Sequence, residues 1–82
     1  MMTRQEVEQL VKSCSNWQLS TMMHDNGTVE IKQLMSEWWS EEDTQEVDTI
    51  LETVANGGQA TRDEEVGATT VVLEDCVVWW WW

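Results

Sequence analysis

Apolar residues recur at helical spacing in three separate stretches of the chain. The spacing i, i+3, i+4, i+7 places four side chains along one stripe of a helix. The three sets are Val7, Leu10, Val11 and Cys14; Ile31, Leu34, Met35 and Trp38; and Val47, Ile50, Leu51 and Val54. The pattern predicts three amphipathic helices whose stripes together form the core.

Capping residues support these helices. Thr3 and Glu6 form the T-x-x-E arrangement, in which each side chain satisfies a backbone N–H of the other residue. The second helix is expected to start near Thr28. Ser40 and Asp43 are alternative caps for the third helix. In each case the position of the capping residue fits the position of the apolar stripe that follows it, which strengthens the prediction.

After the Asn-Gly-Gly stop at 56–58 the pattern changes to period two and to β-branched residues. Residues 59–62 and 69–78 are predicted to be strands of a hairpin whose acidic tip is 63–67. Asp25-Asn26-Gly27 predicts a turn before a short strand at 28–30.

The stretch 16–24 fits either a strand or a continuation of the first helix past Trp17. The preferred interpretation is a helix that continues to about Met22 or Met23.

This order of elements resembles that of winged helix-turn-helix domains. GTVEIKQLMSEW (27–38) is similar to the short first strand and second helix of the family, and VEQLVKSC (7–14) to its first helix. ILETVANGG (50–58) resembles the end of the third helix, and ATTVVLED (68–75) the second wing strand. The resemblance implies an α+β fold over residues 1–82: a small winged-helix-like domain of three helices, a β-hairpin wing and a Trp-rich C-terminal strand.

Charge changes what this resemblance implies about function. Many winged helices place the third helix in the major groove of DNA. Here sixteen acidic residues stand against four basic ones, for a net charge of −12. Phosphate binding needs clustered Lys and Arg, and an anionic membrane makes the same demand. We therefore expect no direct nucleic-acid or membrane partner. Two interpretations of the acidity stay open: a solvated surface suited to high salt, or a face for a basic partner.

The four indoles at 79–82 cannot all be buried in the core of the domain, because a strand directs alternate side chains to opposite faces. One pair, Trp79 and Trp81 or Trp80 and Trp82, can pack on the core of the domain. The other would expose about 300 to 500 Å². Three alternatives remain: packing over the chain's own sheet, a homodimer through the edge of the C-terminal strand, or a foreign partner. Trp80 and Trp82 are chosen as the outward pair.

The expected function is a non-enzymatic acidic protein-interaction module of a nucleic-acid-handling or regulatory assembly, whose partner has a basic or apolar surface. The alternative is an acidic nucleic-acid mimic, such as a phage-type inhibitor, that occupies the basic groove of a DNA-binding protein. Trp38 is expected in the core and Trp39 at the surface. The candidate partner-binding residues are Glu41, Glu42, Glu46, Asp48, Glu52, Trp39, Trp80 and Trp82.

Candidate chemistry is sparse. His24 is the single histidine, and Asp25 beside it in sequence does not establish a catalytic pair. An EF-hand centred on the Asp-Asn-Gly turn would need acidic residues where Met22 and Gln33 stand. No catalytic residue, metal or cofactor is therefore predicted. Cys14 and Cys76 are expected to be two buried thiols. Without a long apolar run or a signal peptide, the expected location is intracellular, either cytoplasmic or nuclear.

Overall fold

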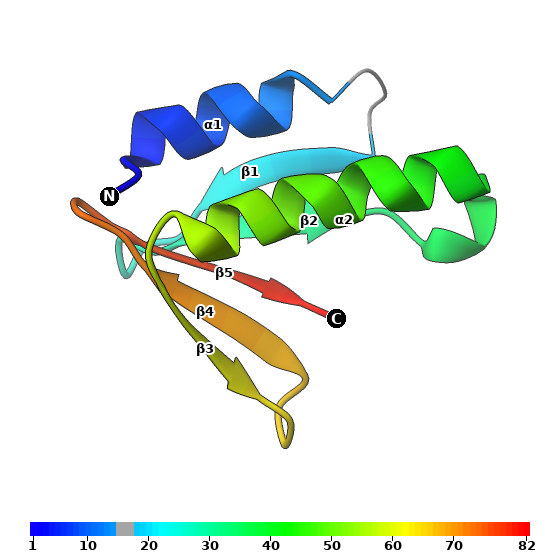
Figure 1. Cartoon of the computed structure of the whole chain (residues 1–82). Helices are drawn as coiled ribbons and strands as arrows, with labels where there is room; N and C mark the ends of the chain where they lie inside the picture. Colours follow the sequence, from blue (N-terminus) through cyan, green and yellow to red (C-terminus); the bar gives the residue numbers. More distant parts are fainter. Residues whose placement is uncertain (15–17) are drawn as a thin grey trace.

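The computed structural model describes residues 1–14 and 18–82 and shows an α+β domain (Figure 1). Within these residues, two α-helices, one 3₁₀ turn and five strands follow one another along the chain. In order they are α1 (Arg4–Lys12), β1 (Leu19–Met23), β2 (Val29–Gln33), η1 (Ser36–Trp38), α2 (Glu41–Asn56), β3 (Gln59–Asp63), β4 (Ala68–Val72) and β5 (Val77–Trp81).

The strands form one mixed sheet in the order β1-β2-β5-β4-β3. The pairs β1–β2, β3–β4 and β4–β5 are antiparallel, whereas β2 and β5 run parallel, with Val29 opposite Val78 and Glu30 opposite Trp79. The parallel pair depends on the long connection through α2, because adjacent parallel strands cannot be joined by a tight turn. The C-terminal strand β5 therefore lies at the centre of the sheet, and β1 and β3 form its edges.

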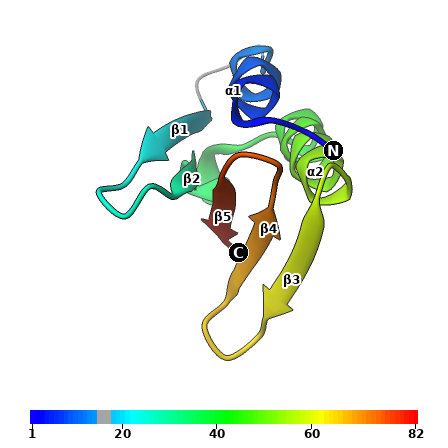
Figure 2. The same ribbon diagram turned by 90° about the vertical axis from the view of Figure 1, so that its left-hand side faces the viewer.

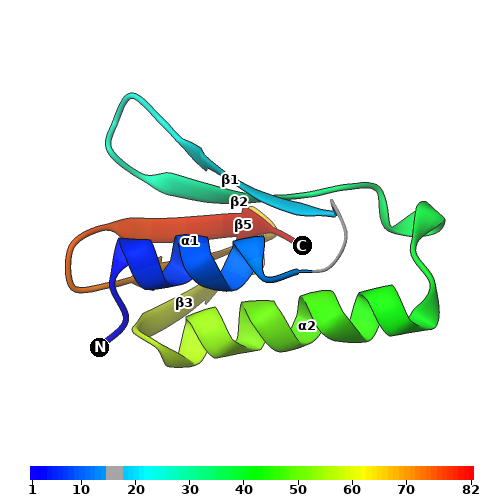
Figure 3. The ribbon, with the colours of Figure 1, turned by 90° about the horizontal axis from the view of Figure 1, so that it is seen from above.

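Helices α1 and α2 lie side by side, in opposite directions, over one face of the sheet (Figures 2 and 3). The core lies between the two layers. Helix α1 contributes Val7 and Val11 to the core, and α2 contributes Val47, Ile50 and Val54. The sheet and the turn after β4 contribute Leu19, Val29, Ile31, Val71, Leu73, Val78 and Trp80. Because side chains alternate along a strand, the neighbours of these sheet residues point to the opposite side. We call that side the open face; it carries Met22, Glu30, Lys32, Val72, Val77, Trp79 and Trp81.

The predicted arrangement of three helices and a hairpin wing is wrong. The stretch expected to be the second helix is β2 followed by η1. Its apolar residues do not share a stripe: Ile31 is 1% exposed, whereas Met35 is 63% and Trp38 70% exposed. In this stretch Val29 and Ile31 alternate with polar residues, which is the pattern of a strand. Strands β1 and β5 pair with β2 on either side, and this pairing decides the structure.

The predicted extension of the first helix is also wrong where the structure describes it, because residues 19–23 are β1. Residues 15–17, which include Trp17, lie outside the described part of the chain. The turn prediction at Asp25-Asn26-Gly27 is confirmed. His24 N–H donates to the carbonyl of Thr28 at 2.8 Å, and Gly27 N–H donates to the carbonyl of His24 at 2.9 Å. Gly27 has a φ of +84°, which favours glycine at this position.

The first and third predicted helices are confirmed. Thr3 with Glu6 and Ser40 with Asp43 each form a complete capping box. Helix α2 ends at the predicted Asn-Gly-Gly sequence. There Gly58 lies against β4, and a Cβ atom at this position would stand 2.4 Å from the carbonyl oxygen of Val72. The close approach of the connection between α2 and β3 to strand β4 therefore requires glycine.

The single strand predicted over 69–78 is two strands, β4 and β5, joined by a turn in which Leu73 N–H donates to the carbonyl of Cys76 at 2.9 Å. Strand β5 consequently has a neighbour on each side. The prediction of an edge-to-edge homodimer assumed that the C-terminal strand lies at an edge of the sheet, whereas β5 lies between β2 and β4.

The tryptophans alternate as expected, but the choice of the outward pair needs correction. Trp80 is core, at 5% exposure, whereas Trp81 is 51% exposed on the open face and Trp82 is 50% exposed. Trp38 and Trp39 are reversed relative to the prediction: Trp38 is exposed, and Trp39 packs against the core. The predicted 3.6-residue period does not apply here, because β2 and a 3₁₀ turn precede α2.

Cys14 and Cys76 are thiols, each half-buried rather than fully buried. Among the residues described, no helix combines the length and the apolar character that crossing a bilayer requires.

Candidate partner-binding groove

A groove of about 380 Å³ runs between α2 and the β3 side of the sheet. Its floor is apolar, and its rim carries two carboxylates and one guanidinium. We call it the α2–β3 groove; its lining residues are Asp48, Leu51, Glu52, Ala55, Ala60, Arg62, Thr69, Trp80 and Trp82.

Helical spacing brings the α2 residues to one side of that helix. Asp48, Leu51, Glu52 and Ala55 stand at i, i+3, i+4 and i+7, so they form a continuous stripe. This stripe lies beside the core stripe of Val47, Ile50 and Val54 on the surface of α2. Its side chains therefore point obliquely toward the sheet. The two acids lie at the outer margin of the groove, where both are exposed to solvent.

Strand pairing supplies the opposite wall. Arg62 of β3 is opposite Thr69 of β4, and Thr69 is opposite Trp80 of β5. These three side chains form one row across the sheet on the helix-facing side. Ala60 stands two residues before Arg62 and points the same way. The small Ala60 leaves open the space that forms the groove.

Arg62 and Trp82 close one end of the groove. The guanidinium carbon of Arg62 lies 4.0 Å from the centroid of the Trp82 ring, within the range of a cation–π contact. Trp82 N–H donates to the carbonyl of Gly67 at 2.9 Å, which ties this residue to the turn between β3 and β4. The Trp82 ring is thus held at the groove by its backbone and by Arg62.

The structure brings four of the predicted partner-binding residues together in this groove: Asp48, Glu52, Trp80 and Trp82. Trp80 takes part as floor and not as an outward side chain, since it is nearly buried. The sequence predicted five acids of α2 as one solvent-facing surface, and two of them line the groove. Nothing in the sequence showed that these two would meet Trp80 and Trp82.

The other four predicted residues lie elsewhere. Glu42 and Glu46 line a separate depression near Ser13 at the end of α1. Glu46 is half-buried and accepts a hydrogen bond from the Cys14 thiol, with Sγ 2.8 Å from Oε1, so it also has a structural role. Glu41 is exposed in the first turn of α2. Trp39 packs against the core, and its Nε1 has no hydrogen-bond partner within the described residues.

Sequence reasoning missed Ala60 and Arg62 as groove residues. Both lie in the stretch correctly predicted to be a strand, so their common orientation followed from period two. What was missing was the position of that strand beside α2 and β4, which local pattern does not show.

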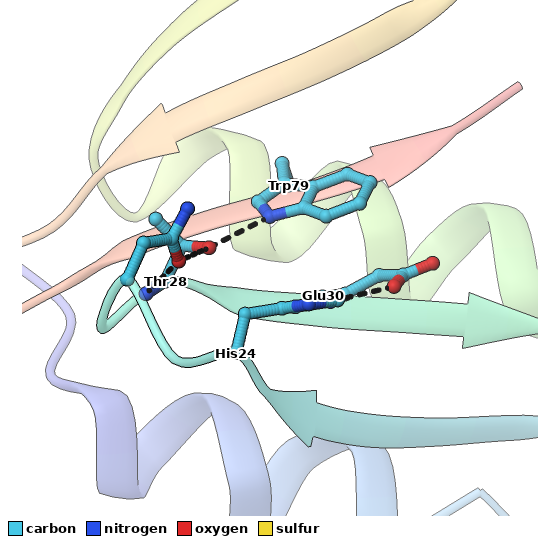
Figure 4. A network of polar contacts seen from close by, with 5 residues as sticks. His24, Thr28, Glu30 and Trp79 are labelled. Atoms are coloured by element: carbon cyan, nitrogen blue, oxygen red, sulfur yellow. Dashed lines mark hydrogen bonds and ion pairs between the residues drawn. The ribbon is translucent and has the colours of Figure 1, made fainter.

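A second cluster lies on the open face, around the turn between β1 and β2 (Figure 4). His24 Nε2 is 2.8 Å from Glu30 Oε1, and the His24 ring centroid is 5.3 Å from that of Trp79. Trp79 Nε1 donates to Thr28 Oγ1 at 3.0 Å, and Trp81 meets Trp79 edge-on with the centroids 5.4 Å apart. His24 therefore pairs with Glu30 of β2 rather than with Asp25, its neighbour in sequence.

The residues that the structure describes include no group of three His, Cys, Asp or Glu side chains that could hold a metal ion. The charged groups of the α2–β3 groove surround an apolar floor. Fold and groove together define a two-layer α+β domain with an acidic-rimmed groove. Comparison of the chain with protein-family models, curated proteins and solved structures finds no match.

Proposed function

We propose that this chain is a non-enzymatic protein-interaction module that binds a basic segment of a partner protein in the α2–β3 groove. The observation that carries the proposal is the meeting of Asp48 and Glu52 with Trp80 and Trp82 around one apolar floor. Acids at the rim of a floor that includes aromatic rings are the arrangement of an interface in which apolar contacts give affinity and charges give orientation.

The groove fits a Lys or Arg side chain flanked by apolar residues. At about 380 Å³ it is near the lower end of ligand-pocket volumes, enough for one or two side chains. The aliphatic stem of Lys or Arg can lie on Leu51 and the indole rings while the charged head reaches the rim carboxylates. Arg62 already shows this contact on Trp82, at 4.0 Å.

Such a partner suits a nucleic-acid-handling or regulatory assembly. Proteins that bind nucleic acid carry clustered Lys and Arg, and these clusters complement a chain of net charge −12. The chain's own four basic residues are dispersed: Arg4, which pairs with Glu8, and Lys12 lie at the two ends of α1, Lys32 is in β2 and Arg62 in β3. This dispersion supports a role through protein contacts.

A matched pair of charge reversals tests the groove. Asp48→Lys with Glu52→Lys changes two rim acids, while Glu41→Lys with Glu42→Lys makes the same change in net charge outside the groove. Partner binding, measured with a labelled Lys/Leu-rich peptide and by affinity capture from the native host, should weaken at least about tenfold for the groove variant alone. Equal losses in both variants would show that overall acidity, and not the groove, determines binding.

Salt dependence separates the alternative function, a nucleic-acid mimic that occupies the basic groove of a DNA-binding protein. A mimic relies on many charge contacts, so its affinity should fall steeply with added salt. Binding through the apolar floor should keep most of its affinity between about 0.05 and 0.5 M NaCl, because screening leaves apolar contacts intact. A steep loss over this range would favour the mimic.

A further inference from the structure

We propose that the open face of the sheet is a self-association surface on which a second copy of this chain packs, face to face, about a two-fold axis. This surface lies on the side of the sheet opposite α1 and α2 (Figure 2). The open face and the α2–β3 groove share Trp82, which lines both the groove and the depression beside Lys32 and Trp81.

The open face exposes apolar side chains on β1, β4 and β5. Trp81 is 51% exposed, Val72 is 47% exposed and Met22 is 43% exposed, and Val72 is paired with Val77 across the β4–β5 ladder. Neither α1 nor α2 covers these side chains in the described part of the chain. Sheets that carry such a surface commonly bury it against a second sheet about 10 Å away.

The charge of the open face favours a second copy of this chain as the molecule that binds there. Among the described strand positions on this face, the charged residues are Glu30, Lys32 and Asp63, and Glu30 is already paired with His24. The face is thus close to neutral on a chain whose net charge is −12. A basic partner would be drawn to the acidic surfaces instead. Two copies that meet through their neutral faces keep the remaining acids on the outside, where solvent screens them.

The positions of the charged and aromatic residues are self-complementary. Glu30 and Lys32 of β2 stand two residues apart, as do Trp79 and Trp81 of the parallel neighbour β5, and Glu30 is level with Trp79. Lys32 and Trp81 line one shared depression further along the pair. A two-fold axis that runs across the strands, midway between these levels, would place Lys32 opposite the Glu30–His24 pair of the second copy, whose Glu30 is 8% exposed, and Trp79 opposite its Trp81.

The polar network beneath this contact fixes the surface before association. Trp79 is held by its hydrogen bond to Thr28, at 3.0 Å, and by the His24 ring, while His24 is held by Glu30 at 2.8 Å (Figure 4). A ring that is already fixed loses little conformational freedom when it is covered, which favours association.

Sedimentation equilibrium of the full chain over a concentration and salt series tests the proposal. We expect a monomer–dimer equilibrium that tightens as salt rises, because salt screens the repulsion between two acidic chains. Trp81→Ser should weaken the dimer at least about tenfold, whereas Trp38→Ser, which removes an indole that is 70% exposed outside the open face, should leave it within about twofold.

Mixing of charge variants tests the two-fold geometry. Lys32→Glu alone and Glu30→Lys alone should each be monomeric, because like charges then face one another. An equimolar mixture should form a heterodimer, in which the two carboxylates of one chain face the two ammonium groups of the other. Circular dichroism checks that each variant folds, and if Glu30→Lys does not fold, the loss of association in Lys32→Glu still decides.

Three outcomes would overturn the proposal. The first is a full chain that stays monomeric up to about 1 mM at every salt concentration. The second is a Trp81→Ser or Lys32→Glu variant that associates like the original chain. The third is a monomeric chain that loses a foreign protein partner on Trp81→Ser, which would assign the open face to that partner.

Discussion

Cys76 shows how one residue's chemistry depends on its neighbours. Burial raises the pKa of its thiol above the usual 9.0, and the charge and hydrogen bond of Asp75 raise it further, while Arg4 acts in the opposite direction. The thiolate is therefore disfavoured in the folded chain. The stability associated with this thiol is fully present below pH 9.0 and is lost as the pH rises through the raised pKa.

Asp75→Asn should lower the pKa of Cys76, because it removes the nearby negative charge and keeps the oxygen that accepts Arg4 N–H at 2.8 Å. In a Cys14→Ser background, the rate of alkylation by iodoacetamide should then reach half its maximum at a lower pH. A midpoint that does not change would show that Asp75 has no part in suppressing the thiolate.

Thr28 supports Trp79 through a single hydroxyl. Thr28→Val keeps the shape of the side chain but removes the acceptor of Trp79 Nε1 and the donor to Asn26 Oδ1. The free energy of unfolding should fall by about 1 to 2 kcal/mol, as measured by urea denaturation. Thr28→Ser keeps the hydroxyl and is the control. Equal effects of the two variants would mean that the hydroxyl contributes no more to stability than the methyl group that Thr28→Ser removes.

At the scale of the element, helix α2 carries a core stripe and a groove stripe side by side. Ile50 and Leu51 are adjacent in sequence, but Ile50 belongs to the core stripe and Leu51 to the groove stripe. Ile50 is 6% exposed in the core, whereas Leu51 is partly exposed in the groove. Ile50→Ala should lower the free energy of unfolding by about 2 to 5 kcal/mol, and Leu51→Ala by about half as much, because its cavity opens to solvent. Chemical denaturation of both variants measures this difference.

The reverse order, with Leu51→Ala the more damaging change, would mean that the groove side of α2 faces the core. Partner binding gives a second measure. Leu51→Ala should weaken binding in the α2–β3 groove while Ile50→Ala, in any folded fraction, should not.

At the scale of the whole molecule, the excess of acidic residues should make stability depend on salt. The net charge of −12 is carried by a chain whose Cα radius of gyration is 12.1 Å, so most carboxylates lie within one Debye length of another at low ionic strength. Raising NaCl from about 0.01 to 0.5 M should raise Tm by about 5 °C or more, since for a domain of this size about 1 kcal/mol corresponds to about 4 to 8 °C. Differential scanning calorimetry measures the shift.

Calorimetry should be performed on Trp81→Ser as well, so that screening within one chain is distinguished from salt-promoted association. A Tm that does not rise in that variant would mean that the acids are spaced widely enough to avoid repulsion. The acidity would then be a matter of surface solvation alone.

The candidate groove was predictable in part. Asp48 and Glu52 could be selected because helical spacing puts them on one side of α2, and Trp80 and Trp82 because strand alternation puts them on one side of β5. Their meeting could not be predicted, since it depends on β4 lying between β3 and β5. Arg62 was missed for the same reason.

Local sequence by itself determined α1 and α2 with their capping boxes, the Asp-Asn-Gly turn, the start of β3 and the acidic charge. These features rest on contacts between residues a few positions apart, and such contacts can be inferred from spacing. Only the tertiary structure decided that 29–33 is a strand and that β5 is central. A helical period fits Ile31, Leu34, Met35 and Trp38. As a strand, however, β2 forms backbone hydrogen bonds with β1 and β5 and buries both Val29 and Ile31, and one isolated helix could not do this.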